Sequence, residues 1–127
     1  MRLNKLKLCK DASDRLKHLK AKTGLAPNIL SRVGFCLSLS DQAIPNPASY
    51  AEDDREFNRY TLLGEWDELF TALLRQRLAK DGLGDSDLEE QFRAHVNRGV
   101  IALFGLVKGT ADLVDLAIRQ FSTISTR

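Results

Sequence analysis

Side chains that could perform catalysis are few, because the chain has only two histidines and two cysteines and no Gly-Xaa-Ser-Xaa-Gly motif. His18 lies on a basic stretch, where we expect it in solvent, and His95 is typical of a hydrogen-bonding residue at a surface or interface. The cysteines and histidines lack the close pairing of a zinc site, and no phosphate-binding glycine loop occurs. We therefore predict no catalytic residue, no metal site and no cofactor, in a protein that is not an enzyme.

Two weaker possibilities for chemistry remain. The adjacent acids at positions 53–54 and 89–90 could bind a metal, although acids in a loop or at a helix start are usually solvated. A thiolate at Cys9 or Cys36 could carry sulfur; lysines surround Cys9, whereas Cys36 lies in an apolar run and looks inert. Because no export signal is recognisable, we expect both thiols to be reduced and the protein to be cytoplasmic.

Binding is better supported, because the positive charge is concentrated in one part of the sequence. Residues 1–32 carry nine basic and two acidic side chains, a net +7, and the other 95 residues carry ten basic and fifteen acidic side chains, a net −5. Such asymmetry favours a polyanionic partner. The candidate DNA contacts are Lys5, Lys7, Lys10, Lys17, Lys20 and Lys22.

These lysines suit phosphate contacts, since each is a mobile point charge. The same stretch has few of the side chains that read base edges, so we expect charge-driven DNA binding with modest sequence preference. We expect the lysines to form one continuous basic surface. The alternative is a basic, solvated face without a partner.

The lysines lie on a predicted strand and a predicted helix. Residues 3–9 alternate in character, which indicates a short strand; the alternative is a disordered or helical basic tail. No second strand follows nearby, so its partner could come from another subunit. A helix is expected to begin at Asp11 or Ser13 and to run to about Thr23. Its buried stripe comprises Ala12, Leu16, Leu19 and Thr23.

Gly24 is suited to end this helix, and Pro27 to begin the next one, over about residues 27–39. The second helix is apolar on most sides, which predicts burial in the core or at a subunit interface. Gly34 would allow a close contact with another helix. One apolar row of this helix comprises Ile29, Val33 and Leu37.

The rest of the chain is expected to be mainly helical. Residues 40–54 predict a long loop, serving as a functional arm or wrapping onto a neighbour. Residues 56–64 favour an extended segment ending at Gly64, although the spacing of Phe57, Tyr60 and Gly64 also matches a helix. Helices are expected at about 65–80, from 88 into the apolar run ending at 107, and from about 110.

Particular residues mark these helices. Trp66 and Leu69 belong to the apolar row of the first one. Ser86 and Glu89 have the spacing of a capping box for the second. Gly99 and Gly105 within an apolar helix indicate tight packing against another helix.

The expected organisation is a single domain, 1–127, large enough for one core. It consists of a basic strand–helix–helix segment (1–39), a loop (40–55) and a helical core (56–127). The longest apolar stretch is far too short to span a bilayer, so we expect no membrane contact. The fold class is mainly α with a short N-terminal strand, and strand–helix–turn–helix is the order of the ribbon-helix-helix module, in which two chains pair their strands.

Three stretches resemble the DndE family, which belongs to the bacterial Dnd system that replaces a non-bridging phosphate oxygen of DNA by sulfur. They are DRLKHLKAKTGLAPNILSRVGFCLSLS (14–40), EFNRYTLLGEWDELFTALLRQ (56–76) and HVNRGVIALFGLV (95–107). The resemblance implies a mainly helical homotetramer that binds duplex DNA, with a preference for nicked duplex, through the N-terminal lysines. It also implies that the sulfur chemistry belongs to partner proteins: a cysteine desulfurase, an iron–sulfur protein with likeness to ATP pyrophosphatases, and a further ATPase.

Three other functions stay open. A sequence-specific ribbon-helix-helix regulator would need a base-reading strand face and a palindromic site. A pure scaffold would use the apolar segments 29–39 and 100–107 to assemble partners, and its charge would only aid solubility. A latent enzyme, such as a nickase, is the least supported alternative.

Overall fold

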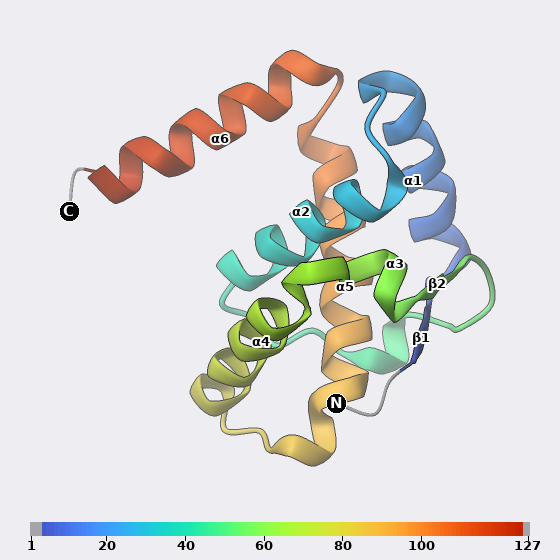
Figure 1. The fold of residues 1–127 in the computed structure, drawn as a ribbon, viewed down its shortest axis with the longest axis vertical. Helices are drawn as coiled ribbons and strands as arrows, with labels where there is room; N and C mark the ends of the chain where they lie inside the picture. The colour runs from blue at the N-terminus through green and yellow to red at the C-terminus, as the bar shows by residue number, and fades with distance from the viewer. Residues whose placement is uncertain (1–3, 126–127) are drawn as a thin grey trace.

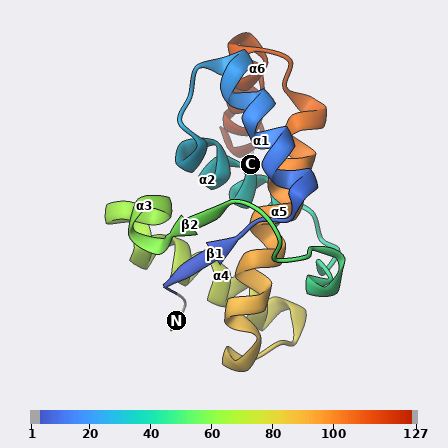
Figure 2. The same cartoon turned by 90° about the vertical axis from the view of Figure 1, so that its right-hand side faces the viewer.

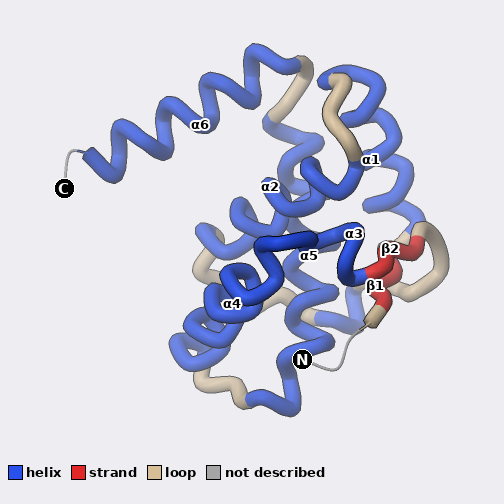
Figure 3. The backbone as a smooth tube through the Cα atoms, viewed as in Figure 1, coloured by secondary structure: helices blue, strands red, loops and turns tan. Residues whose placement is uncertain are grey.

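The computed structural model describes residues 4–125 and is mainly helical, as the sequence predicts (Figure 1 and Figure 3). Leu3, where the expected strand begins, and residues 126–127 lie outside the described range. The elements in chain order are β1 (Lys5–Lys7), α1 (Lys10–Thr23), α2 (Pro27–Ser40), β2 (Glu56–Asn58), α3 (Arg59–Leu63), α4 (Asp67–Asp81), α5 (Leu88–Leu106) and α6 (Thr110–Ser125). Single 3-10 turns occupy Pro47–Ser49, Gly64–Trp66 and Asp85–Asp87.

The short strand β1 pairs with β2 of the same chain in an antiparallel ribbon, with Leu6 opposite Phe57. Leu6 and Phe57 face the core and are almost completely buried. The pairing continues beyond β1, because the N–H of Leu8 donates to the carbonyl oxygen of Arg55 at 2.8 Å. This corrects the expectation that the partner strand comes from another subunit: the long loop returns residues 56–58 to β1.

The segment 56–64, expected to be extended, is extended only as far as Asn58. The Asn58 side-chain oxygen accepts a hydrogen bond from the N–H of Tyr60 at 2.8 Å, which caps the short helix α3. Leu62 and Leu63 of α3 are buried. The local capping bond therefore ends the strand, despite the strand propensity of its neighbours.

The basic helix α1 is held by its predicted apolar stripe, in which Ala12, Leu16 and Leu19 are fully buried. Its start differs from the prediction, because neither Asp11 nor Ser13 caps it. The helix begins at Lys10, whose N–H donates to the side chain of Asp53 at 3.0 Å. The capping acid thus comes from the loop. Gly24 ends the helix in the left-handed region, at φ 73°, as predicted.

The core is built on the crossing of α2 and α5, where two glycines meet (Figure 1). A Cβ atom on Gly99 would lie 1.8 Å from the carbonyl oxygen of Gly34, so neither helix tolerates a larger residue without moving. The prediction of tight packing is confirmed for Gly34 and Gly99. It is wrong for Gly105, where an added Cβ atom would meet nothing within 4 Å.

Within the chain, the apolar α2 buries the residues that flank the row Ile29, Val33 and Leu37. Leu30 and Phe35 are buried, whereas Ile29 is 38% exposed. The Phe35 ring lies 5.5 Å from that of Phe70 and 5.4 Å from that of Phe92, which joins α2 to both α4 and α5. The glycine contact decides this orientation, because it turns the Gly34 side of α2 towards α5.

The long loop between α2 and β2 folds back onto its own chain. Arg77 of α4 and Arg98 of α5 both donate to the carbonyl oxygen of Ala43, at 2.9 and 2.6 Å. Arg93 of α5 donates to the carbonyl oxygen of Tyr50. These guanidinium groups satisfy backbone carbonyls that a loop without regular structure would leave unpaired. Within the chain, the loop is therefore a fixed segment.

The later helices show two further differences from the sequence analysis. Trp66 and Leu69, expected in an inward row, are about half exposed at 49% and 51%. Ser86 does not cap α5; instead, Asp87 accepts a hydrogen bond from the N–H of Gly84 at 3.2 Å. The following helix α6 points away from the rest of the fold (Figure 1). None of the helices within residues 4–125 has the length and apolar character needed to cross a membrane.

Candidate nucleic-acid interface

The two ribbon lysines, Lys5 and Lys7, are exposed, because Leu6 between them takes the inward position. Opposite them on β2 stand Asn58 and Glu56. The Nζ of Lys5 lies 3.8 Å from a carboxylate oxygen of Glu56, and both side chains are largely in solvent. The outer face of the ribbon therefore carries two cations and one acid.

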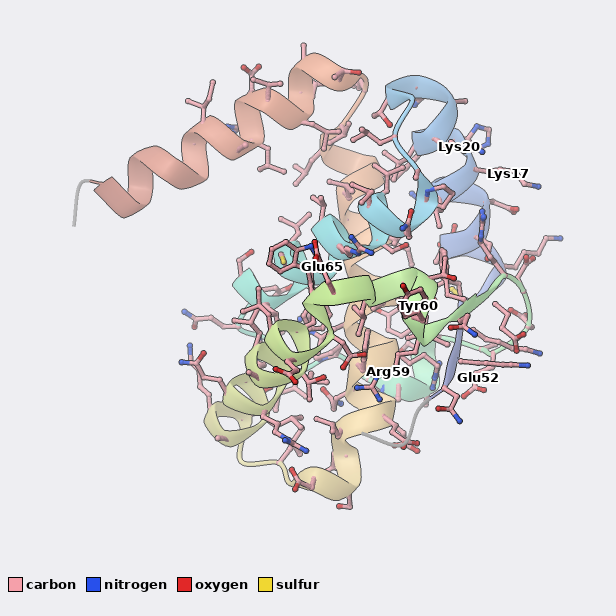
Figure 4. All side chains as sticks on the ribbon, in the orientation of Figure 1. Lys17, Lys20, Glu52, Arg59, Tyr60 and Glu65 are labelled. Carbon is pink, nitrogen blue, oxygen red and sulfur yellow. The ribbon has the colours of Figure 1, made fainter. Side chains whose placement is uncertain are left out.

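The four lysines of α1 are exposed as well. Lys17 and Lys20 project from the outer side of the helix (Figure 4). The Nζ of Lys22 lies 4.8 Å from the centre of the Phe104 ring, and the guanidinium of Arg15 lies 5.0 Å from the same centre. The Phe104 ring thus orders one flank of the helix by cation–π contact.

The ribbon and α1 lie on one side of the molecule, with the loop before β2 passing beside their junction (Figure 2). That loop is acidic: Asp53 caps the α1 N-terminus, and Glu52 and Asp54 are exposed nearby in the sequence. On α1 itself, Asp11 accepts from Arg15 at 2.7 Å. The expected continuous basic surface is therefore interrupted, and its least neutralised part is the second half of α1, whose residues 15–24 contain no acid.

Several arginines of α2, α4 and α5 bind groups inside the fold. Arg77 is only 7% exposed and forms a 2.8 Å ion pair with Asp81, whose side chain is also buried. Arg98 donates to the Ser38 hydroxyl at 2.9 Å, and Arg32 of α2 donates to the Leu62 carbonyl at 2.5 Å. These guanidinium groups are occupied by the protein, so the lysines provide the exposed charge on the α1 and ribbon side.

The two histidines have different surroundings. His18 is exposed, as expected, but His95 is fully buried, which corrects its placement at a surface or interface. Its Nδ1 lies 2.8 Å from the Ser38 hydroxyl. Burial, followed by the charges of Arg98 and Arg77, lowers the pKa of His95 from 6.5 to about 4. At neutral pH this imidazole is therefore a neutral core residue.

Both cysteines are free thiols. Cys9 is buried at the junction of β1 and α1, where its backbone N–H donates to the side-chain oxygen of Asn97 at 2.9 Å. Cys36 on α2 is an exposed residue, but the protein partly covers its thiol. This partial burial raises the pKa of the thiol. Within residues 4–125, no three His, Cys, Asp or Glu side chains are grouped in a way that could hold a metal ion.

A feature that the sequence analysis missed lies at the end of the ribbon. Tyr60 is 81% exposed at the start of α3, next to a shallow hollow of about 420 Å³. Asn4 and Asn58 contribute amide side chains to this hollow. The Arg59 guanidinium donates to both carboxylate oxygens of Asp67, at 2.6 and 2.5 Å, and these bonds hold the pKa of Asp67 below its usual range. The sequence signal was an aromatic residue directly after an Asn-Arg pair.

Comparisons with known proteins are consistent with a nucleic-acid role. The family model described as DNA sulphur modification protein DndE matches residues 5–109, which ends just before α6. No protein in a curated set matches the sequence.

Among solved structures, the chain is similar to DndE from Escherichia coli B7A, involved in DNA phosphorothioation modification. The two are 30% identical with a TM-score of 0.67, over 81% of this chain and 98% of that one. It is also similar to a glycine-to-lysine mutant of DndE involved in DNA phosphorothioation, with 27% identity and a TM-score of 0.64, over 81% of this chain and 99% of that one.

Proposed function

Because the chain belongs to the DndE family of DNA sulphur modification proteins, we propose that it is the DNA-binding, non-enzymatic subunit of a phosphorothioation system. It binds duplex DNA, with a preference for nicked duplex, and its partners are the other Dnd proteins in the cytoplasm. The contacts are Lys5, Lys7, Lys10, Lys17, Lys20 and Lys22.

One observation supports this proposal above the others: all six lysines are exposed, while arginines of the helical core are bound by the protein itself. Lysines held at the surface of a strand and a helix give phosphate contacts without base readout. The second half of α1, with Lys17, Lys20 and Lys22, carries most of the binding in this proposal because no acid neutralises it.

A sequence-specific ribbon-helix-helix regulator is less well supported. That fold needs the first strands of two chains to pair, and here β1 pairs with β2 of its own chain. The ribbon also presents lysines and Glu56 on its outer face, and a regulator would need side chains there that read base edges.

We further propose a homotetramer, assembled through the apolar side of α2. A hollow of about 440 Å³ between α2 and α6 is lined by apolar side chains, including Val33, Leu37 and Leu113. Val114 and Ile118 on α6 are more than half exposed. An apolar surface of this kind is stabilised when another subunit covers it.

The test is an electrophoretic mobility shift on intact and nicked duplexes of the same sequence, with Lys17→Glu and Lys20→Glu combined. We expect binding to weaken about tenfold or more at moderate salt, because two phosphate contacts become repulsive. The matched control combines Arg75→Glu and Lys80→Glu on the exposed side of α4, which changes the net charge equally.

The control should lose much less affinity than the α1 variant. Equal losses would show that net charge alone drives binding, and wild-type affinity in the α1 variant would refute the assignment of the interface. Sizing of both variants should give the same oligomer as the wild type, since neither pair lies on the apolar side of α2.

A further inference from the structure

Tyr60 is the most exposed large apolar side chain described in the chain, although α3 is otherwise anchored by buried leucines. At 81% exposure, the ring contributes little to the core, so the fold gives no reason for an aromatic residue at this position. Figure 4 shows it in front of α3, on a short element between the ribbon and α4. An exposed aromatic ring of this kind is suited to contact a ligand.

The backbone beneath Tyr60 is fixed. Its N–H is bound by the Asn58 side chain at 2.8 Å, and the N–H of Arg59 donates to the carbonyl oxygen of Asn4 at 2.8 Å. Arg59 is in turn held by Asp67. The backbone that carries the ring is therefore bonded to both strands of the ribbon. This fixed backbone reduces the conformational entropy lost when a ligand stacks on the ring.

The surroundings indicate the chemistry of that ligand. The amides of Asn4 and Asn58 line the same hollow and can donate to or accept from the edge of a planar heterocycle. Lys5 stands opposite Asn58 in the ribbon and is exposed, so a cation suited to phosphate follows directly after Asn4, one of the residues that line the hollow. A stacking face, amide edges and a cation together match a nucleotide.

We propose that Tyr60 is a stacking platform for an unpaired nucleobase, the kind of base found at a gap or in single-stranded DNA. This inference rests on the proposed DNA-binding function. In intact duplex both faces of every base are covered by neighbouring bases, so the platform acts only where the stack is interrupted. It adds selectivity for interrupted duplex to the general phosphate binding by the lysines.

The test compares Tyr60→Phe with Tyr60→Leu, which are both apolar and fill a similar space. Affinities are measured by fluorescence anisotropy for three DNAs of one sequence: intact duplex, duplex with a one-nucleotide gap, and single strand. Because stacking on an aromatic ring contributes about 1–3 kcal/mol per base, Tyr60→Leu should weaken gapped and single-stranded binding about tenfold. Tyr60→Phe should bind all three DNAs like the wild type, and intact duplex should not distinguish the variants.

Leu69→Ala is the control for removing another exposed apolar side chain, and it should leave all three affinities unchanged. Equal affinities of Tyr60→Leu and wild type for gapped and single-stranded DNA would overturn the stacking proposal, while leaving the lysine interface in place. A loss of oligomer in Tyr60→Leu without loss of DNA affinity would also overturn it, in favour of a protein contact. A wild-type protein that binds none of the three DNAs would overturn both proposals.

Discussion

Lysine and arginine carry the same charge, yet two regions of this molecule use them differently. On the ribbon and α1 the cations are mostly lysines, and their ammonium groups are in solvent. Around the α2–α5 crossing and the loop 41–55 they are arginines, whose planar guanidinium groups bind the loop carbonyl oxygens of Ala43, Pro47 and Tyr50. A guanidinium group can satisfy several acceptors at once, whereas a hydrated ammonium stays available to an outside anion. The type of cation therefore separates a structural region from a binding region.

The largest expected effect on stability is at Arg77, in the arginine region. Arg77→Met leaves the buried Asp81 carboxylate without its partner and removes the guanidinium that donates to the Leu39 carbonyl at the end of α2. The Ala43 carbonyl in the loop loses one of its two donors and keeps Arg98. We expect the free energy of unfolding to fall by about 3–5 kcal/mol, measured by urea denaturation. Arg75→Met on the same helix, where the side chain is 53% exposed, should cost less than about 0.5 kcal/mol. Similar losses at the two positions would contradict the structural role of Arg77.

The second effect concerns the two glycines of α5. Gly99→Ala places a Cβ against the Gly34 carbonyl and should lower the free energy of unfolding by about 3 kcal/mol, because the helices must separate. Gly105→Ala has open space and should raise it by about 1 kcal/mol through helix propensity. Thermal and urea unfolding of both variants measure the contrast. Changes of the same sign in the free energy of unfolding of both variants would refute the close packing at the crossing of α2 and α5.

The third effect is a pH dependence of the free energy of unfolding, which His95 causes from its buried position beside Ser38. The pKa of His95 is about 4 in the folded protein and about 6.5 in the unfolded chain, so the unfolded chain binds the proton first as the pH falls. The contribution of neutral His95 to the free energy of unfolding is fully present above about pH 6.5, and it is lost as the pH falls towards 4. Between pH 7 and pH 5 the loss should be about 2 kcal/mol.

His95→Gln removes the titrating group and keeps a polar side chain near Ser38. Urea denaturation at pH 7 and at pH 5 gives the free energy of unfolding of both proteins. Between these two pH values the variant should lose about 2 kcal/mol less than the wild type. The comparison stays above the range in which carboxylates titrate. An identical pH dependence in the two proteins would contradict a lowered pKa of His95 in the folded state.

The smallest effect on stability is expected in the lysine region. Lys17→Glu combined with Lys20→Glu should change the free energy of unfolding by less than about 0.5 kcal/mol, because both side chains are in solvent. The same variant has the largest expected effect on DNA affinity. A large loss of stability would mean that these lysines are structural, and the distinction between the two regions would fail.

Local patterns in the sequence were sufficient for the helices and for part of their packing. The apolar stripe of α1 predicted its buried side and, by exclusion, the exposure of its lysines. Gly24 and Pro27 marked the turn between α1 and α2, and Gly34 and Gly99 marked a close helix contact. Each of these signals lies within a few residues of the feature it determines.

Contacts between distant segments could not be read in this way. Asp53 caps a helix that begins 43 positions earlier, and β1 pairs with a strand that is far from it in the sequence. The burial of His95 depends on α2 and α4, which surround it with Ser38 and Arg77. Tyr60 was missed because strand propensity suited it equally well to an extended segment. Its exposure follows from the Asn58 cap that begins α3.

The pairing of Leu6 with Phe57 has a consequence for the order of folding. The ends of a long chain segment must be brought together before this ribbon can form, and that closure costs entropy that local helix formation does not. The helices α1 and α2 can form and dock first, and the ribbon closes late. During synthesis, Leu6 lacks its cross-strand partner until Phe57 has left the ribosome. The strand that presents Lys5 and Lys7 is therefore fixed in place only when the fold is nearly complete.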